Sequence, residues 1–205
     1  TEAQNLVFAP IVFQTAHSLR ELGILSVLEQ SGKKGLSAQQ IAQHTQVSEY
    51  GVKVLLDMAI SAHMVTWDEP NYCLANLGYF LLHDEMTQVN MEFTADICYA
   101  AMMHLTESIK TGKPAGLVEL GNWDTIYEGL SRLPETAKKS WFEFDHFYSD
   151  RAFPVLLKEV FAAKPSHIVD IGGNTGKWAI QCCAYDEQVS VTIVDLPQQL
   201  EMAMQ

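Results

Sequence analysis

The stretch that decides the fold is Pro165-Ser-His-Ile-Val-Asp-Ile-Gly-Gly-Asn-Thr-Gly176. Its apolar first part predicts a short buried strand, and its last five residues predict a glycine-rich turn. Lys177–Tyr185 then predicts a helix, and Val189–Val194 predicts a second strand that is closed by Asp195. Strand, helix and strand in this order form a βαβ unit, whose strands are parallel and joined by a right-handed crossover.

Two common phosphate-binding motifs do not fit this turn. A Walker A loop has four residues between its glycines and then Lys-Ser/Thr, but only three residues separate Gly172 from Gly176, and Trp178 follows Lys177. A dinucleotide GxGxxG motif would need glycine where Asn174 and Lys177 stand. The pattern that fits is Asp-x-Gly-x-x-x-Gly after one strand, with an acid at the end of the next.

Such a turn suits a ligand that carries a carboxylate and a ribose. Glycines let the backbone approach a ligand closely, and the next helix presents free N–H groups to an anionic group. Asp195 stands at the carboxyl end of its strand, where open α/β sheets bind ligands. Its two oxygens can accept hydrogen bonds from both hydroxyls of a ribose.

Residues 1–75 follow the element order of a winged helix. Ser37-Ala-Gln-Gln40 is a capping-box pattern, and Ser48 is a good N-cap for a longer helix that follows it. The expected elements are helical residues before a break at Gly23, then Ile24–Gln30, Ser37–His44, Glu49 to about His63, and a hairpin of Met64–Trp67 and Tyr72–Ala75.

Charge argues against DNA as the partner of this module. The whole chain has 13 Lys and Arg against 25 Asp and Glu, a formal net charge of −12. A DNA-reading helix contacts phosphates through Lys and Arg, but Lys53 is the only Lys or Arg in Ser48–Met64. The apolar first helix, with Phe8 and Phe13, has more hydrophobic surface than one small domain covers. The sequence therefore favours packing against another protein, with no nucleic-acid partner.

Other classes of protein are also disfavoured. An acidic chain does not suit an anionic membrane surface, and no signal peptide or transmembrane segment is apparent. The cysteines lack metal-ligand spacing and stand at Cys73, Cys98, Cys182 and Cys183. We expect a soluble, cytoplasmic protein with reduced thiols and no metal site.

The middle of the chain, residues 77–164, is predicted to be helical throughout. The expected helices are Met91–Lys110, Trp123–Leu133 and Glu135 to about Tyr148, the last of which follows Pro134. The aromatic residues of the third helix are either core residues or the lining of a ligand cavity.

Val169-Asp-Ile-Gly-Gly-Asn-Thr-Gly176 and Val194-Asp-Leu-Pro197 resemble the S-adenosylmethionine-binding motifs of small-molecule O-methyltransferases with an N-terminal winged-helix dimerisation domain. The resemblance implies an α+β and α/β fold: a mainly helical winged-helix dimerisation domain over residues 1–92, then residues 93–205 with a helical acceptor region and the start of a Rossmann-like methyltransferase domain. It also implies a homodimer formed through the N-terminal helices.

By this resemblance the cofactor is S-adenosyl-L-methionine. The residues expected to contact it are Asp170, Gly172, Gly173 and Gly176 around its methionine part, Asp195 at its ribose and Ser149 near its carboxylate, together with Asn174 and Leu196. Asn174 departs from the family pattern, which has a third glycine here, but Asn tolerates a positive φ better than most residues.

The implied reaction is methyl transfer to a hydroxyl of a small aromatic acceptor, and the candidate acceptor-contacting residues are Met103, Trp141, Phe142 and Asp145. His104 and His146 are either structural or part of the acceptor cavity. In the family, the catalytic histidine and adenine-binding residues follow the second strand, so we expect this chain to be an inactive fragment without the catalytic base. The alternatives are a non-catalytic winged-helix regulator or scaffold that keeps the cofactor fold, and then a winged-helix transcription factor.

Overall fold

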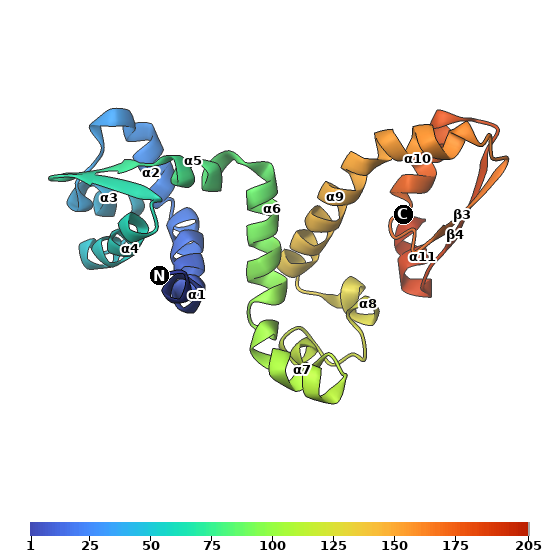
Figure 1. The fold of residues 1–205 in the computed structure, drawn as a ribbon, viewed down its shortest axis with the longest axis horizontal. Coiled ribbons are helices and arrows are strands. Elements are labelled where there is room, and N and C mark those ends of the chain that lie inside the picture. The colour runs from blue at the N-terminus through green and yellow to red at the C-terminus, as the bar shows by residue number, and fades with distance from the viewer. Residues whose placement is uncertain (205) are drawn as a thin grey trace. The chain divides into compact units, whose positions relative to one another are not determined.

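The computed structural model describes residues 1–204 and separates into two compact units, Thr1–Met91 and the residues from Glu92 onward (Figure 1). The predicted second domain includes Gln205, which lies outside the described residues. Within the described residues, no helix combines the length and the apolar character needed to cross a lipid bilayer.

The first unit consists of helices and one hairpin. Its elements are α1 (Glu2–Glu21), α2 (Ile24–Ser31), the 3-10 turn η1 (Gly32–Lys34), α3 (Ala38–Thr45), α4 (Glu49–Ser61), β1 (Val65–Asp68), β2 (Asn71–Leu74), α5 (Asn76–His83) and most of α6 (Glu85–Phe93).

The predicted helix starts of this unit are confirmed. Gly23 has a φ of 70° and separates α1 from α2. Ser37 and Gln40 form the capping box at the start of α3, and the Ser48 hydroxyl accepts a hydrogen bond of 3.1 Å from the Gly51 amide at the start of α4. The hairpin is also confirmed, with Val65 opposite Leu74 and Asp68 opposite Asn71.

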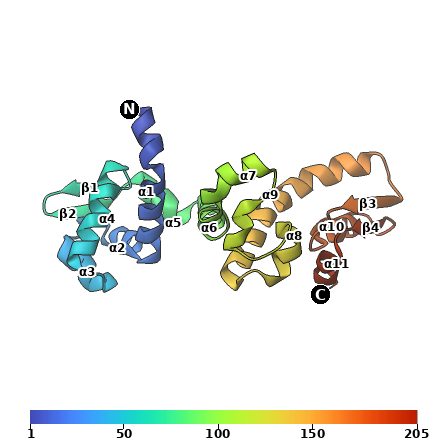
Figure 2. The same cartoon turned by 90° about the horizontal axis from the view of Figure 1, so that it is seen from below.

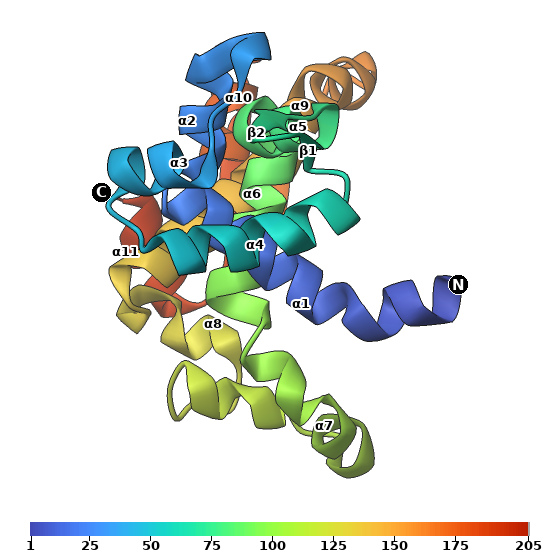
Figure 3. The same cartoon turned by 90° about the vertical axis from the view of Figure 1, so that its left-hand side faces the viewer.

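The core of this unit lies where α1, α2, α3 and α4 meet the hairpin. Its fully buried side chains include Leu19, Ile24, Leu25, Leu28, Ile41, Leu56 and Met64. The N-terminal half of α1 projects beyond this core (Figures 2 and 3) and leaves Leu6, Val7, Phe8 and Ile11 exposed.

The second unit begins with short helical pieces and ends in a βαβ arrangement. Its elements are the π-helical turn η2 (Thr94–Cys98), η3 (Ala101–His104), α7 (Leu105–Thr111), η4 (Ala115–Glu119), α8 (Ile126–Gly129), η5 (Leu130–Arg132), α9 (Glu135–Ala162), β3 (His167–Ile171), α10 (Lys177–Tyr185), β4 (Ser190–Val194) and α11 (Pro197–Ala203).

The predicted single helix over Met91–Lys110 is wrong. The segment is divided among the end of α6, a π-helical turn, a 3-10 turn and α7. A Cβ added to Gly116 would collide with the Ala101 carbonyl, so η4 packs directly on the backbone of η3. Hydrophobic spacing does not report such a change of helical pitch.

The predicted helix over Trp123–Leu133 is also wrong, because only α8 and η5 form there. The Trp123 ring fills the space beside Gly121 and Gly129, where any Cβ would overlap it. The Arg132 guanidinium lies 5.5 Å from the same ring. Packing of the indole on two glycines therefore replaces the first turns of the helix.

The helix predicted to end near Tyr148 is longer in the structure, because α9 continues through Pro154 to Ala162. A proline inside a helix removes one backbone hydrogen bond. Phe147 and Leu157 are buried on either side of Pro154, and Leu157 packs in the core beside the sheet, so burial on both sides supports the helix across the proline.

The two strands of the second unit are parallel, with His167 opposite Ser190 and Ile171 opposite Val194, as the βαβ pattern predicts. Leu157, Cys182 and Val189 form the core on one face of this sheet. The strand was predicted to be buried, which is wrong: Val169 and Ile171 are 54% and 82% exposed. Alternate strand residues point to opposite faces, and among the described residues the helical core covers only one of them.

Candidate functional site

A cavity of about 430 Å³ opens at the carboxyl ends of β3 and β4. Volumes of this size are typical of small-molecule sites. The lining residues come from α8, η5, α9, the glycine turn, the link between β4 and α11, and α11 itself; they are Tyr127, Leu130, Trp141, Asp145, Gly172, Asn174, Asp195, Leu196 and Gln199. Of the predicted cofactor residues, Gly172, Asn174, Asp195 and Leu196 therefore meet at one cavity.

The glycine turn has the backbone conformation that its sequence predicts. Gly172 has a φ of 76°, and its amide donates a hydrogen bond of 2.8 Å to the Val194 carbonyl. A Cβ added to Gly172 would meet no atom within 4 Å, so open space lies above it. Gly176 has a φ of 75° and starts α10. Asn174 adopts a φ of 51° where the resembled family has glycine.

Gly173 serves a different purpose from Gly172. A Cβ added there would lie 2.6 Å from Asp170 Oδ2 and 2.8 Å from Ile193 Cγ2. The missing side chain lets the turn pack closely on the ends of both strands. Gly173 is therefore needed for packing beneath the turn, whereas Gly172 leaves space above it.

Asp195 is fixed by two backbone amides. Its Oδ2 accepts a hydrogen bond of 2.8 Å from the Asn174 amide, and its Oδ1 accepts one of 2.7 Å from the Leu196 amide. Each carboxylate oxygen can accept a second hydrogen bond. The half-buried carboxylate is thus oriented at the cavity wall and keeps acceptor capacity for a ligand.

Several polar atoms around the turn are buried without a partner. Within residues 1–204, no hydrogen bond is made by Asp170 Oδ2, Asn174 Oδ1 or Thr175 Oγ1. Burial, and then the nearby Asp195 carboxylate, raise the pKa of Asp170 above its ordinary value. Unsatisfied buried polar atoms are uncommon in folded proteins, and here they gather at the turn.

The candidate acceptor residues are divided among different places. Trp141 and Asp145 line the cavity, and Asp145 Oδ2 accepts a hydrogen bond of 2.6 Å from Asn174 Nδ2. Phe142 stacks on His146, with 6.0 Å between the ring centroids, and is not among the lining residues. Met103 lies on η3, is 82% exposed and does not line the cavity.

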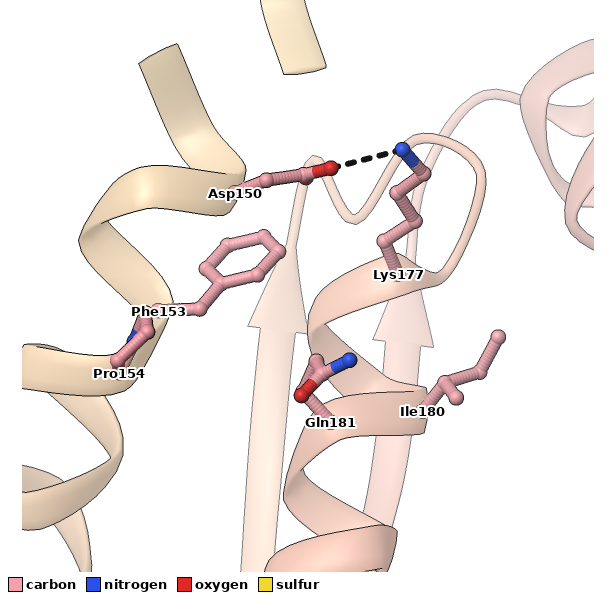
Figure 4. Close-up of a pocket in the computed structure, with 6 residues that line it drawn as sticks. All are labelled: Asp150, Phe153, Pro154, Lys177, Ile180 and Gln181. Carbon is pink, nitrogen blue, oxygen red and sulfur yellow. Dashed lines mark hydrogen bonds and ion pairs between the residues drawn. The ribbon is translucent and has the colours of Figure 1, made fainter. Parts of the chain in front are cut away.

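A second cleft of about 390 Å³ lies between α9 and α10. Figure 4 shows Lys177 and Asp150 pointing toward one another across it, with 2.8 Å between Nζ and Oδ2. The Ser149 hydroxyl donates a hydrogen bond of 3.4 Å to Asp150 Oδ1. Ser149, which was expected near the cofactor carboxylate, therefore contacts this ion pair and does not line the first cavity.

His146 belongs to the same group as the ion pair. Its Nδ1 lies 3.8 Å from Asp150 Oδ1. Burial, and then the Lys177 ammonium, lower the pKa of His146, while Asp150 and Asp145 act in the opposite direction. The other histidine considered above is His104, whose Nε2 lies 2.8 Å from Glu119 Oε1.

The sequence did not single out three of the residues that line the first cavity: Tyr127, Leu130 and Gln199. The available signal for Gln199 was its position two residues after Pro197, in the helix that follows Asp195. The charged side chains that line this cavity are all acidic. Asp145 and Asp195 are the charged residues among its lining side chains, and none of these is Lys, Arg or His.

Comparisons with known proteins place the fold. Residues 1–72 match the family model of a Dimerisation2-like domain. No curated protein matches the chain by sequence. Among solved structures, the S-adenosylmethionine-dependent methyltransferase SibL matches with a TM-score of 0.68 and 22% identity over 100% of this chain and 60% of its own.

Two further structures give the same result. The mitomycin 7-O-methyltransferase MmcR matches with a TM-score of 0.70 and 18% identity over 99% of this chain and 60% of its own. The human N-acetylserotonin methyltransferase, solved in complex with SAM, matches with a TM-score of 0.66 and 18% identity over 98% of this chain and 60% of its own. The chain has the fold of these proteins and spans about 60% of their length.

Proposed function

We propose that the intact protein transfers a methyl group from S-adenosylmethionine to a hydroxyl of a small aromatic acceptor, and that this chain supplies its cofactor-binding turn. The observation that carries the proposal is the single cavity at which Gly172, Asn174, Asp195 and Leu196 meet. The fold shared with several methyltransferases supports it.

The residues at this cavity fit the proposed cofactor. The open space above Gly172 can admit its methionine part, and the free acceptor capacity of Asp195 suits the two ribose hydroxyls. Since no cationic side chain is among the residues that line the cavity, a phosphorylated nucleotide would meet two carboxylates without compensation. A nucleoside without phosphate suits this charge better.

The chain's residues would contribute binding and orientation. Bound there, S-adenosylmethionine would supply an activated methyl group on its sulfonium. Asp195 would fix the ribose, the turn would hold the methionine part, and Trp141 and Asp145 would face the acceptor. Holding two reactants in the right geometry is itself a large part of catalysis. We assign no general base to these residues.

The remaining parts of the proposal concern the architecture. Residues 1–92 would be a winged-helix dimerisation domain, supported by the Dimerisation2-like match and the exposed apolar part of α1. Residues 93–205 would be the acceptor region and the start of a Rossmann-like domain. A homodimer of a cytoplasmic enzyme would follow, with small molecules as its ligands and no role for nucleic acid.

Calorimetric titration of the chain tests this proposal. We expect saturable binding of S-adenosylhomocysteine, the product form of the cofactor, with no binding of ATP or NAD under the same conditions. Binding of ATP or NAD in preference to S-adenosylhomocysteine would refute it. Binding without methyl transfer in the intact protein would instead support the alternative of a non-catalytic scaffold.

A further inference from the structure

Gln199 is a buried polar residue of the second unit. It lies in the first turn of α11, where its backbone N–H donates a hydrogen bond of 2.9 Å to the Leu196 carbonyl. Its side chain is 3% exposed. Within residues 1–204, neither Nε2 nor Oε1 of this side chain has a hydrogen-bond partner.

A buried amide without partners is costly, because it has lost its hydrogen bonds to water and gained none in return. A structural role would be met more cheaply by leucine or methionine. Gln199 also lines the cavity that contains Asp195. A donor and an acceptor held side by side at a ligand cavity are suited to a ligand that presents the complementary pair.

The neighbouring walls indicate the shape of that ligand. Tyr127 and Leu130 line the same cavity and offer a flat and an apolar surface. The Tyr127 and Trp141 rings pack edge to face, with 6.5 Å between their centroids, so each ring limits the movement of the other. Such a wall accommodates a planar ring, and Gln199 lines the same cavity.

We infer that Gln199 recognises the adenine edge of the bound nucleoside through a pair of hydrogen bonds. The inference rests on the proposed function, in which Asp195 holds the ribose. The Oε1 atom accepts from the adenine amino group and the Nε2 group donates to a neighbouring ring nitrogen, which is the pairing that Gln and Asn make with adenine in nucleic acids. Gln199 is thus a specificity residue for the base.

The test compares two ligands and three variants by calorimetry on the 205-residue chain. The ligands are S-adenosylhomocysteine and its analogue with hydrogen in place of the 6-amino group. The variants are Gln199→Leu, Gln199→Met and the control Gln198→Leu, which changes an exposed neighbour on the same helix. Melting temperatures are recorded for all of them.

The chain should prefer S-adenosylhomocysteine over the analogue that has hydrogen in place of the 6-amino group by about tenfold in affinity, equivalent to about 1.4 kcal/mol. Both Gln199 variants should lose this preference, bind S-adenosylhomocysteine at least tenfold more weakly and melt no lower than the parent chain, whereas Gln198→Leu should keep the preference. Two carbon-chain replacements of different shape ensure that one failure to fold does not decide the result.

The outcomes separate this inference from the proposed function. If the parent chain binds neither ligand, the proposed function fails and the inference fails with it. If the parent chain binds S-adenosylhomocysteine and the Gln199 variants retain both its affinity and the tenfold preference, only the inference is overturned. Equal weakening of both ligands by Gln199→Leu would also overturn it, because the amide would then contact something other than the base edge.

Discussion

Replacing Gly173 by alanine tests whether the turn is shaped by packing beneath it. The added Cβ would lie 2.6 Å from Asp170 Oδ2 and 2.8 Å from Ile193 Cγ2. Carbon atoms pack best at about 3.5–4.0 Å, so Ile193 would have to retreat by about 0.7 Å or more. Ile193 is a β-branched residue in β4, with a restricted χ1.

The expected loss is that of an overpacked core, about 1–3 kcal/mol. In a chain of this size, each kcal/mol lowers the melting temperature by about 2–4 °C. Differential scanning calorimetry measures this shift. In the double variant with Asp170→Ala, the nearest atom is absent, so the loss caused by Gly173→Ala should be smaller by about 0.5 kcal/mol or more.

Gly172 is the matched control, because its Cβ would meet no atom within 4 Å. Its φ of 76° makes Gly172→Ala unfavourable by about 1–2 kcal/mol through backbone strain alone. Gly172→Asn should recover part of that loss, because Asn visits the left-handed region, whereas Gly173→Asn should not. A Gly173→Ala variant as stable as the parent chain would refute the packing argument.

Three further predictions follow from individual contacts. Because the pKa of Asp170 is raised in the folded chain, its carboxyl favours folding fully only below about pH 3.9, and that contribution is lost as the pH rises through the folded pKa. Urea unfolding should therefore show Asp170→Asn to be more stable than the parent chain at pH 7 but not at pH 3, and a stability difference that does not change with pH would contradict this. Lys177→Met removes a cation that lowers the pKa of His146, so an NMR titration should find that pKa higher in the variant, and an unchanged or lower value would count against the arrangement. Gly35→Ala combines a φ of 62° with a collision between the added Cβ and the Tyr72 carbonyl. In urea unfolding it should destabilise the first unit by about 2–4 kcal/mol, and a loss below about 1 kcal/mol would contradict the prediction.

Local backbone chemistry explains which elements the sequence could predict. Ser37 and Ser48 satisfy free amides at helix starts whatever surrounds them. Gly172 and Gly176 likewise hold positive φ values that few other residues adopt. These features depend on neighbours in sequence, so the helix starts and the glycine turn were found without knowledge of the tertiary structure.

The errors arose where distant packing decides the local structure. Trp123 stands in a run with a helical pattern, yet its ring packs on Gly121 and Gly129 and no helix forms around it. Pro154 favours a helix end, yet buried side chains on both sides carry α9 through it. Neither outcome can be read from spacing or propensity, because each depends on contacts that only the folded chain brings together.

The candidate site could be predicted only in part. The strand, turn and acid pattern located Gly172, Asn174, Asp195 and Leu196 at one cavity. It could not locate Gln199, since a glutamine in the first turn of a helix is usually solvated and only its burial distinguishes it. Nor could it show that Ser149 contacts Asp150.

The central claim is that Asp195 holds the ribose of the cofactor, and a ligand-side titration tests it most directly. S-adenosylhomocysteine and its 2′-deoxy analogue are titrated into the unaltered chain, and then into Asp195→Ala. A hydrogen bond to a charged group contributes about 1.5–3 kcal/mol, so we predict that the chain binds the deoxy analogue at least tenfold more weakly, and that Asp195→Ala loses most binding of both ligands. Equal affinity of the unaltered chain for the two ligands would contradict the claim.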